Sequence, residues 1–125
     1  MVDNIDKTML VRAVISQIED KGRPRPIKIE AKDLEEYDTP IKIFSKGKNN
    51  AFIPDLAVYY YDELNFYEIE LDEKMDIEKW ELMSLHTKKY KGHLYLVVPD
   101  IRRERVKSKL KEKKIKAGLI YFDTE

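Results

Sequence analysis

The sequence predicts an α/β fold, in which helices and strands pack in layers around one hydrophobic core. Two observations support this prediction. Apolar runs of strand length alternate with segments whose apolar residues recur at helical spacing, most clearly after residue 75. The chain has 125 residues, 42% of them hydrophobic, and domains most often contain about 100 to 150 residues. We therefore expect a single domain that covers residues 1–125.

The first part of the chain predicts one helix followed by four strands. An apolar stripe at helical spacing predicts a helix that ends at Lys21, before Gly22, with Asp3 or Asn4 as its N-cap. The alternating or β-branched runs that follow predict strands over residues 27–30, 41–43, 53–60 and 66–71. The last two strands are expected to form a hairpin, because only a short polar link separates them. Residues 46–50 have the composition of a turn.

The second part of the chain alternates helices and strands. Asp76 is a suitable N-cap for a helix that ends at Gly92. The continuous apolar run at residues 94–98 is typical of a central strand that is covered on both faces. Residues 101–116 predict a highly charged helix, and residues 119–122 predict the last strand. The expected order is therefore α-β-β-β-β-α-β-α-β.

The composition excludes several classes of site. The chain has no cysteine, which excludes disulfides, thiolate zinc sites and a cysteine nucleophile. Two histidines are too few for a histidine-rich metal site. The motifs of phosphate-binding loops, dinucleotide-binding folds and serine hydrolases are absent. No apolar run approaches the roughly 18 residues that span a bilayer, and the first residues do not resemble a signal peptide, so we expect a cytoplasmic protein with no membrane partner.

The 24 basic and 24 acidic residues cancel, but they gather in different parts of the chain. Residues 55–78 contain nine acids and one base, whereas residues 102–116 contain nine bases and two acids. Lysine and arginine gain affinity for nucleic acids by displacing counterions from phosphates, so the basic segment is a candidate DNA-binding helix. A solvated helix whose long side chains cover apolar surface is the alternative. The candidate nucleic-acid-binding residues are Lys46, Lys48, Arg102, Arg103, Lys107 and Lys111.

Three acids of the predicted strands form the candidate catalytic site. Glu68 and Glu70 are two residues apart in a strand, so their side chains leave the same face. Asp55 lies near the start of the preceding strand, and the hairpin can bring it within reach of the same ion as Glu68. Carboxylates grouped in this way suit Mg²⁺ or Mn²⁺, which would polarise a phosphate and activate water. Protection of an exposed strand edge from aggregation is the alternative role for these charges.

The order of these motifs and elements resembles the PD-(D/E)xK nuclease superfamily. Pro54-Asp55 is followed in the next strand by Glu68-Ile69-Glu70, and then by a helix, an apolar strand, a helix and a final strand. The resemblance covers nearly the whole chain and implies a restriction-endonuclease-like fold, with a central mixed sheet flanked by helices. It also implies that Asp55, Glu68 and the carbonyl of Ile69 hold a divalent metal.

Glu70 departs from the superfamily pattern, which usually has lysine at this position. Some restriction enzymes of the superfamily have glutamate here, and other branches carry the lysine on the following helix. The resemblance therefore implies that Glu70 or a helix lysine, Lys79 or Lys89, orients the attacking water or stabilises negative charge. A weaker similarity, carried by residues 67–70 and 88–90, is to replication-relaxation proteins of mobile elements.

Residues and resemblance together predict metal-dependent hydrolysis of DNA phosphodiester bonds. The alternative is an inactive nuclease-like module that binds DNA or a protein in a mobile-element or defence system. A chain of this size would need a homodimer or a partner protein to cut both strands. Asp55 and Glu68 are expected to share one side of the sheet, facing the helix that starts near Asp76. Trp80 is expected in the core, because it lies on the apolar stripe of that helix.

Overall fold

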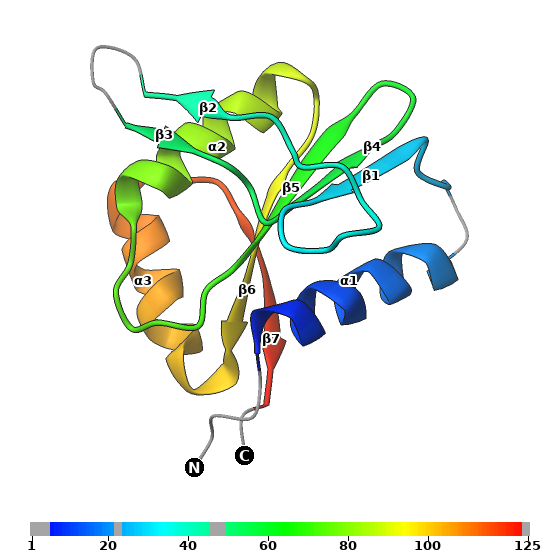
Figure 1. Ribbon diagram of the computed structural model, residues 1–125. Helices are drawn as coiled ribbons and strands as arrows, with labels where there is room; N and C mark the ends of the chain where they lie inside the picture. Colours follow the sequence, from blue (N-terminus) through cyan, green and yellow to red (C-terminus); the bar gives the residue numbers. More distant parts are fainter. Residues whose placement is uncertain (1–5, 22–23, 46–49, 124–125) are drawn as a thin grey trace.

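The computed structural model describes residues 6–21, 24–45 and 50–123, and it shows an α/β fold with helices on both faces of a mixed sheet (Figure 1). In spatial order the five strands of this sheet are β1 (Lys28–Ala31), β4 (Leu56–Tyr59), β5 (Leu64–Ile69), β6 (Leu94–Pro99) and β7 (Gly118–Phe122). β4 pairs with β1 and β5 in antiparallel orientation, whereas β6 pairs with β5 and β7 in parallel orientation. The predicted α/β class, the β4–β5 hairpin and the central position of β6 are confirmed.

The helices of the described residues are α1 (Lys7–Lys21), α2 (Ile77–Lys89) and α3 (Arg103–Lys113). α1 covers one face of the sheet through residues such as Val11 and Val14, whereas α2 and α3 cover the other face through Trp80 and Val106 (Figure 1). Trp80 is fully buried, as the apolar stripe of its helix predicts. None of the helices in the described ranges is long and apolar enough to cross a membrane.

Aspartate side chains cap the first turns of α1 and α2. Asp6 Oδ1 accepts a hydrogen bond of 2.9 Å from the amide of Met9, and Asp76 Oδ1 accepts one of 3.3 Å from the amide of Lys79. These bonds satisfy amide groups that have no partner inside the helix. The predicted cap at Asp76 is confirmed. The cap proposed at residues 3 and 4 lies outside the described residues.

The connection between β1 and β4 differs from the prediction. A separate two-stranded sheet forms from β2 (Ile43–Phe44) and β3 (Ala51–Phe52), and residues 33–40 contain turns and no helix. The predicted strand 53–60 is shortened to β4. Its first residues leave the ladder because Pro54 has no amide hydrogen and the amide of Asp55 donates to a side chain instead. The predicted turn at 46–50 lies outside the described residues, except for Asn50.

The predicted helix at 101–116 is divided and ends early. A 3-10 turn (Asp100–Arg102) precedes α3, which ends before Lys114. Lys114 adopts a left-handed conformation with φ of 57°. A residue with a Cβ atom is strained there, whereas glycine is not.

We expect Lys114→Gly to stabilise the protein by about 1 kcal/mol in urea-induced unfolding, because it relieves this strain. Lys113→Gly is the matched control. It places the same new residue inside α3 and is expected to destabilise the protein by about 1 kcal/mol. Equal effects of the two variants would contradict the left-handed end of α3.

Candidate active site

Charged side chains gather where β4 begins and β5 ends. We call this group the acid–lysine cluster, and its members are Asp55, Glu68, Glu70, Lys7, Lys32 and Lys79. The three acids are only 2%, 2% and 9% exposed. Carboxylates are seldom buried to this extent unless they are paired, because removal from water penalises their charged form. The cluster is therefore an exception that needs a structural or functional reason.

Asp55 and Glu68 are joined by two reciprocal hydrogen bonds between neighbouring strands. The amide of Asp55 donates to Glu68 Oε2 at 2.7 Å, and the amide of Ile69 donates to Asp55 Oδ2 at 2.9 Å. Both bonds lie just beyond the pairing of Leu56 with Tyr67 in the β4–β5 hairpin. The structure thus brings Asp55 and Glu68 together, as the hairpin predicts. The contact shown for Ile69 is that of its amide, whereas the resemblance assigns its carbonyl.

Lys79, in the first turn of α2, lies between Glu68 of β5 and Glu70, which directly follows β5. Its Nζ is 3.0 Å from Glu68 Oε1 and 3.1 Å from Glu70 Oε2. Trp80 Nε1 also donates to Glu70 Oε2, at 3.0 Å. The alternation of β5 explains this arrangement, because the side chains of Glu68 and Glu70 leave the face that α2 covers.

Lys89, the other candidate cation of α2, does not reach the acids. It lies ten residues after Lys79, which corresponds to about 15 Å along a helix. It lines a different cavity at the end of α2. Of the two lysines that the prediction left open, Lys79 is therefore the one that contacts the carboxylates among the described residues.

Two further lysines face Asp55, and sequence reasoning did not select either of them. Lys7 Nζ lies 3.1 Å and Lys32 Nζ 3.6 Å from Asp55 Oδ1. This buried oxygen accepts no hydrogen bond from the described residues, so the two ion pairs are its polar contacts there. Lys7 begins α1 and Lys32 follows β1. In the sequence both lysines have the pattern of surface residues, and each is more than twenty residues from Asp55, so no local pattern links them to it.

Burial raises the pKa of Glu68 to about 7, and the negative charge of Asp55 acts in the same direction. Lys79 and the amide of Asp55 oppose this rise by stabilising the ionised carboxylate. Burial alone would lower the pKa of Lys79, but Glu68 and Glu70 outweigh it and raise that pKa. Lys79 is therefore charged at neutral pH, whereas the charged form of Glu68 is disfavoured by its surroundings. A carboxyl group perturbed in this way beside a fixed cation is typical of functional sites.

The cluster offers two carboxylates to a divalent ion. Within the described residues no group of three or more histidine, cysteine or acidic side chains is arranged to hold a metal, and Glu70 is instead bonded to Trp80 and Lys79. Mg²⁺ needs only one or two carboxylates when water and substrate phosphate supply its other ligands. Asp55 Oδ1 accepts no hydrogen bond in the part of the chain that the structure describes, and the side chains of its ion-pair partners Lys7 and Lys32 are 38% and 34% exposed. These flexible side chains can turn outward, so Asp55 and Glu68 fit such an ion.

Arg102 and Arg103, two of the predicted nucleic-acid-binding residues, have partners within the protein. The guanidinium of Arg102 donates to the carbonyls of Leu71 and Asp72, which follow β5. Arg103 lies over the ring of Tyr121, 5.3 Å from its centroid. Arg102 thereby ties the 3-10 turn before α3 to the chain that follows β5, and its role in nucleic-acid binding stays a prediction.

The other predicted nucleic-acid-binding residues remain candidates. Lys107 and Lys111 are exposed on α3, on the side of the sheet that also carries Glu68 and Glu70. Lys46 and Lys48 lie outside the described residues. α3 therefore keeps a basic surface even though its first arginines are engaged.

The site thus combines two predicted metal ligands, one of the two predicted helix cations and two lysines that no sequence pattern indicated. Its parts come from α1, β4, β5, α2 and the residue after β1. Only the folded chain brings them together.

Comparisons of the chain with protein-family models, with curated proteins and with solved structures found no match.

Proposed function

We propose that this protein is a metal-dependent nuclease that hydrolyses phosphodiester bonds of DNA. The observation that carries this proposal is the convergence of Asp55, Glu68 and Lys79 in one buried cluster. Phosphodiester hydrolysis needs a group that polarises the phosphate and activates water, and a bound divalent metal supplies both. It also needs positive charge where negative charge develops, which a fixed lysine supplies.

The sheet topology supports a restriction-endonuclease-like fold for this site. The antiparallel strands β1, β4 and β5 are followed by α2 and then by β6, which is parallel to β5. The succession of β4, β5, α2 and β6 is the one on which the resemblance to the PD-(D/E)xK superfamily rests, and β1 corresponds to the predicted strand that is additional to it. In this arrangement the start of β4, the end of β5 and the first turn of α2 meet at one place.

Each member of the cluster has a distinct role in the proposed reaction. Asp55 and Glu68 hold Mg²⁺ or Mn²⁺, and Lys79 donates to a phosphate oxygen or orients the attacking water. Glu70 is a positioning residue, because it bonds Lys79 and Trp80 and so fixes the direction of the lysine. Lys7 and Lys32, which balance Asp55 in the free protein, turn toward the substrate phosphate.

The basic surface of α3 supports nucleic acid as the substrate. Lys107 and Lys111 are exposed, and α3 packs on the same face of the sheet as α2. Lysines on such a surface bind phosphates irrespective of base sequence. Cleavage of both strands of a duplex then requires a second site, which a homodimer or a partner protein provides.

Purified protein is expected to cut DNA with Mg²⁺ or Mn²⁺ and to be inactive with EDTA. Asp55→Asn should lower the cleavage rate about a thousandfold, because the metal contributes several kcal/mol to transition-state stabilisation. Circular dichroism should show that the variant is folded. Asp100→Asn, which changes an exposed acid outside the cluster, should cut like the wild type.

Two results would contradict the proposal. Wild-type protein that binds DNA but cuts neither duplex, single-stranded nor branched substrates would favour the inactive DNA-binding module. Cleavage by Asp55→Asn at the wild-type rate would remove the acid–lysine cluster from the reaction.

A further inference from the structure

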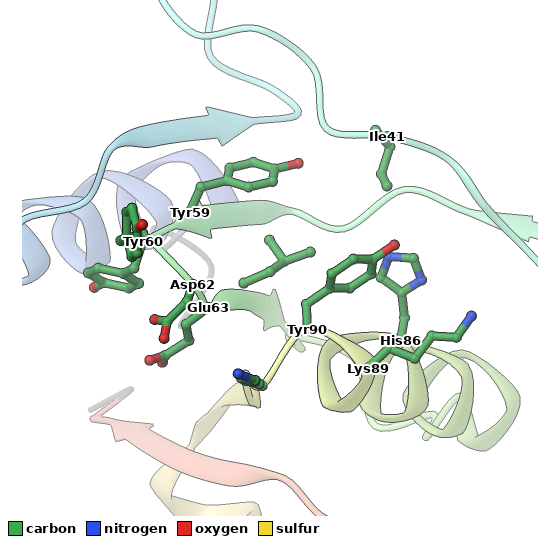
Figure 2. Close-up of a pocket in the computed structure, with 11 residues that line it drawn as sticks. Ile41, Tyr59, Tyr60, Asp62, Glu63, His86, Lys89 and Tyr90 are labelled. Atoms are coloured by element: carbon green, nitrogen blue, oxygen red, sulfur yellow. The ribbon is translucent and has the colours of Figure 1, made fainter.

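A cavity, shown in Figure 2, lies at the turn of the β4–β5 hairpin and the end of α2. The acid–lysine cluster lies at the other ends of these elements. The volume of the cavity is about 540 Å³, which is within the range of small-molecule sites, roughly 300 to 1,000 Å³. We call it the aromatic cavity, and its lining includes Ile41, Tyr59, Leu64, His86 and Tyr90. The nuclease mechanism proposed above uses none of these residues.

Three rings of this cavity, those of His86, Tyr90 and Tyr59, contact neighbouring side chains. His86 stacks on Phe66 with a centroid distance of 5.6 Å, and Tyr90 lies 5.2 Å from His86. The hydroxyl of Tyr59 donates to Glu30 Oε1 at 2.8 Å, which holds its ring in place. Figure 2 shows the rings of His86 and Tyr90 extending from α2 toward Tyr59 and Ile41. Tyr90 remains 51% exposed, so a planar ligand can stack on it.

His86 adds a polar atom that has no partner among the described residues. Its Nε2 is buried and makes no hydrogen bond there. Burial and the nearby Lys89 lower the pKa of His86, so the ring is neutral at pH 7 and has one donor and one acceptor. An unpaired buried nitrogen is costly, and a planar ring that carries donors and acceptors can satisfy it once the His86 side chain turns it toward the cavity. Nucleobases are rings of this kind.

The charges around the aromatic cavity indicate where phosphates would lie. Lys89 and Lys91 border it on the α2 side, and neither forms an ion pair with an acid of the described residues. Asp62 and Glu63 border the hairpin side and would repel an anion (Figure 2). A nucleotide is therefore expected to enter with its phosphate toward the end of α2.

The two sites lie along the same helix. Lys79 is in the first turn of α2, and His86 and Tyr90 follow seven and eleven residues later, which corresponds to about 10 and 16 Å of helix. A few nucleotides of a single strand span this distance. A base within a duplex is paired and stacked and cannot enter a cavity unless it is flipped out.

We propose that the aromatic cavity binds one unpaired nucleobase of a single-stranded nucleic acid whose phosphate, a few nucleotides away, lies at the acid–lysine cluster. This inference rests on the proposed nuclease function for the placement of that phosphate, and it narrows the substrate to nucleic acids with a single-stranded segment. Stacking on Tyr90 supplies affinity that depends little on base identity, because every base has an aromatic face. The charges of Lys89 and Lys91 hold the flanking phosphate.

The test is a fluorescence-anisotropy titration of the full chain with labelled oligomers in EDTA, so that no cleavage occurs. Thymidine and uridine oligomers should bind more tightly than a duplex of equal length, and their comparison distinguishes DNA from RNA. Tyr90→Ala should weaken single-strand binding about tenfold, which corresponds to the loss of one base–aromatic stack. Tyr90→Phe should retain binding, because the ring remains. Leu85→Ala, an exposed apolar residue of α2 outside the cavity, should bind like the wild type.

A second series locates the bound base. The series consists of thymidine oligomers that each carry one abasic site, at a different position in each oligomer. Affinity should fall only when the abasic site occupies the position that enters the cavity. In Tyr90→Ala all oligomers of the series should bind with equal affinity. Duplex binding as tight as single-strand binding, or unchanged affinity of Tyr90→Ala, would overturn the inference. These titrations contain no metal, so they test base binding separately from cleavage. A protein that binds single strands through Tyr90 but does not cleave DNA would support the base site and contradict the nuclease function. A protein that cleaves DNA with metal but binds it equally well without Tyr90 would support the nuclease function and contradict the base site.

Discussion

Glu68→Gln is expected to gain about 3 kcal/mol of stability relative to the wild type as the pH rises from 4.5 to above 7. Burial raises the pKa of Glu68 from 4.5 to about 7 in the folded protein. A group with a raised folded pKa contributes its full stability below the unfolded pKa and loses it as pH rises through the folded pKa. Glutamine has nearly the same shape and never ionises, so its variant avoids this loss. Urea-induced unfolding at a series of pH values measures the difference.

The matched control is Glu81→Gln, which changes an exposed glutamate of α2. Its stability should follow that of the wild type across the same pH range. Parallel stability curves for Glu68→Gln and the wild type would show that Glu68 is not perturbed by burial.

The same substitution is expected to abolish DNA cleavage, with a loss of about a thousandfold if Glu68 holds the metal. A Glu68→Gln protein that is more stable and less active than the wild type would show that Glu68 serves activity and lowers the stability of the folded protein. If the ion pair between Glu68 and Lys79 served only the structure, its removal would not change the cleavage rate of the folded protein. Retained cleavage in a folded Glu68→Gln protein would therefore exclude Glu68 as a metal ligand.

Local patterns predict most of the elements that carry the site. The β4–β5 hairpin, the cap of α2 at Asp76 and the central strand β6 follow from alternation, capping chemistry and apolar runs within a few residues of each other. The start of β4 at Leu56, three residues later than the predicted start, does not follow from the local sequence. It depends on the amide of Asp55 donating to Glu68, which is thirteen residues away in the chain. The predicted strand 41–43 overlaps β2 only at Ile43, and β3 was not predicted, because each of these strands has only two residues.

The candidate site divides in the same way. Asp55 and Glu68 can be paired from the sequence, because a hairpin and a period of two place them on neighbouring strands. The choice of Lys79 over Lys89 depends on how α2 lies across β5, which helical periodicity does not define. Lys7 and Lys32 belong to other elements, and surface lysines there carry no distinguishing pattern. Sequence reasoning therefore finds the acids of the cluster more readily than the cations that balance them.

Lys79→Met is expected to destabilise the protein by about 3 kcal/mol near pH 8, because it leaves Glu68 and Glu70 without the cation that lies 3.0 and 3.1 Å from them. The loss should become smaller in acid, where Glu68 is protonated and needs no counter-charge. If Lys79 stabilises the transition state as proposed, cleavage should fall at least about a hundredfold at every pH. Urea-induced unfolding and cleavage assays of the same preparations measure both effects.

Lys88→Met and a double variant make this last prediction specific. Lys88 is an exposed lysine of the same helix, and its replacement should change stability by less than about 0.5 kcal/mol and leave cleavage unchanged. Glu68→Gln combined with Lys79→Met should lose less stability than Lys79→Met alone at pH 8, because the uncompensated carboxylate has been removed. A coupling of about 1 to 3 kcal/mol between the two positions is expected for groups in direct contact. Additive effects would show that Lys79 acts on the fold independently of Glu68, and the acid–lysine cluster would then not be one electrostatic unit.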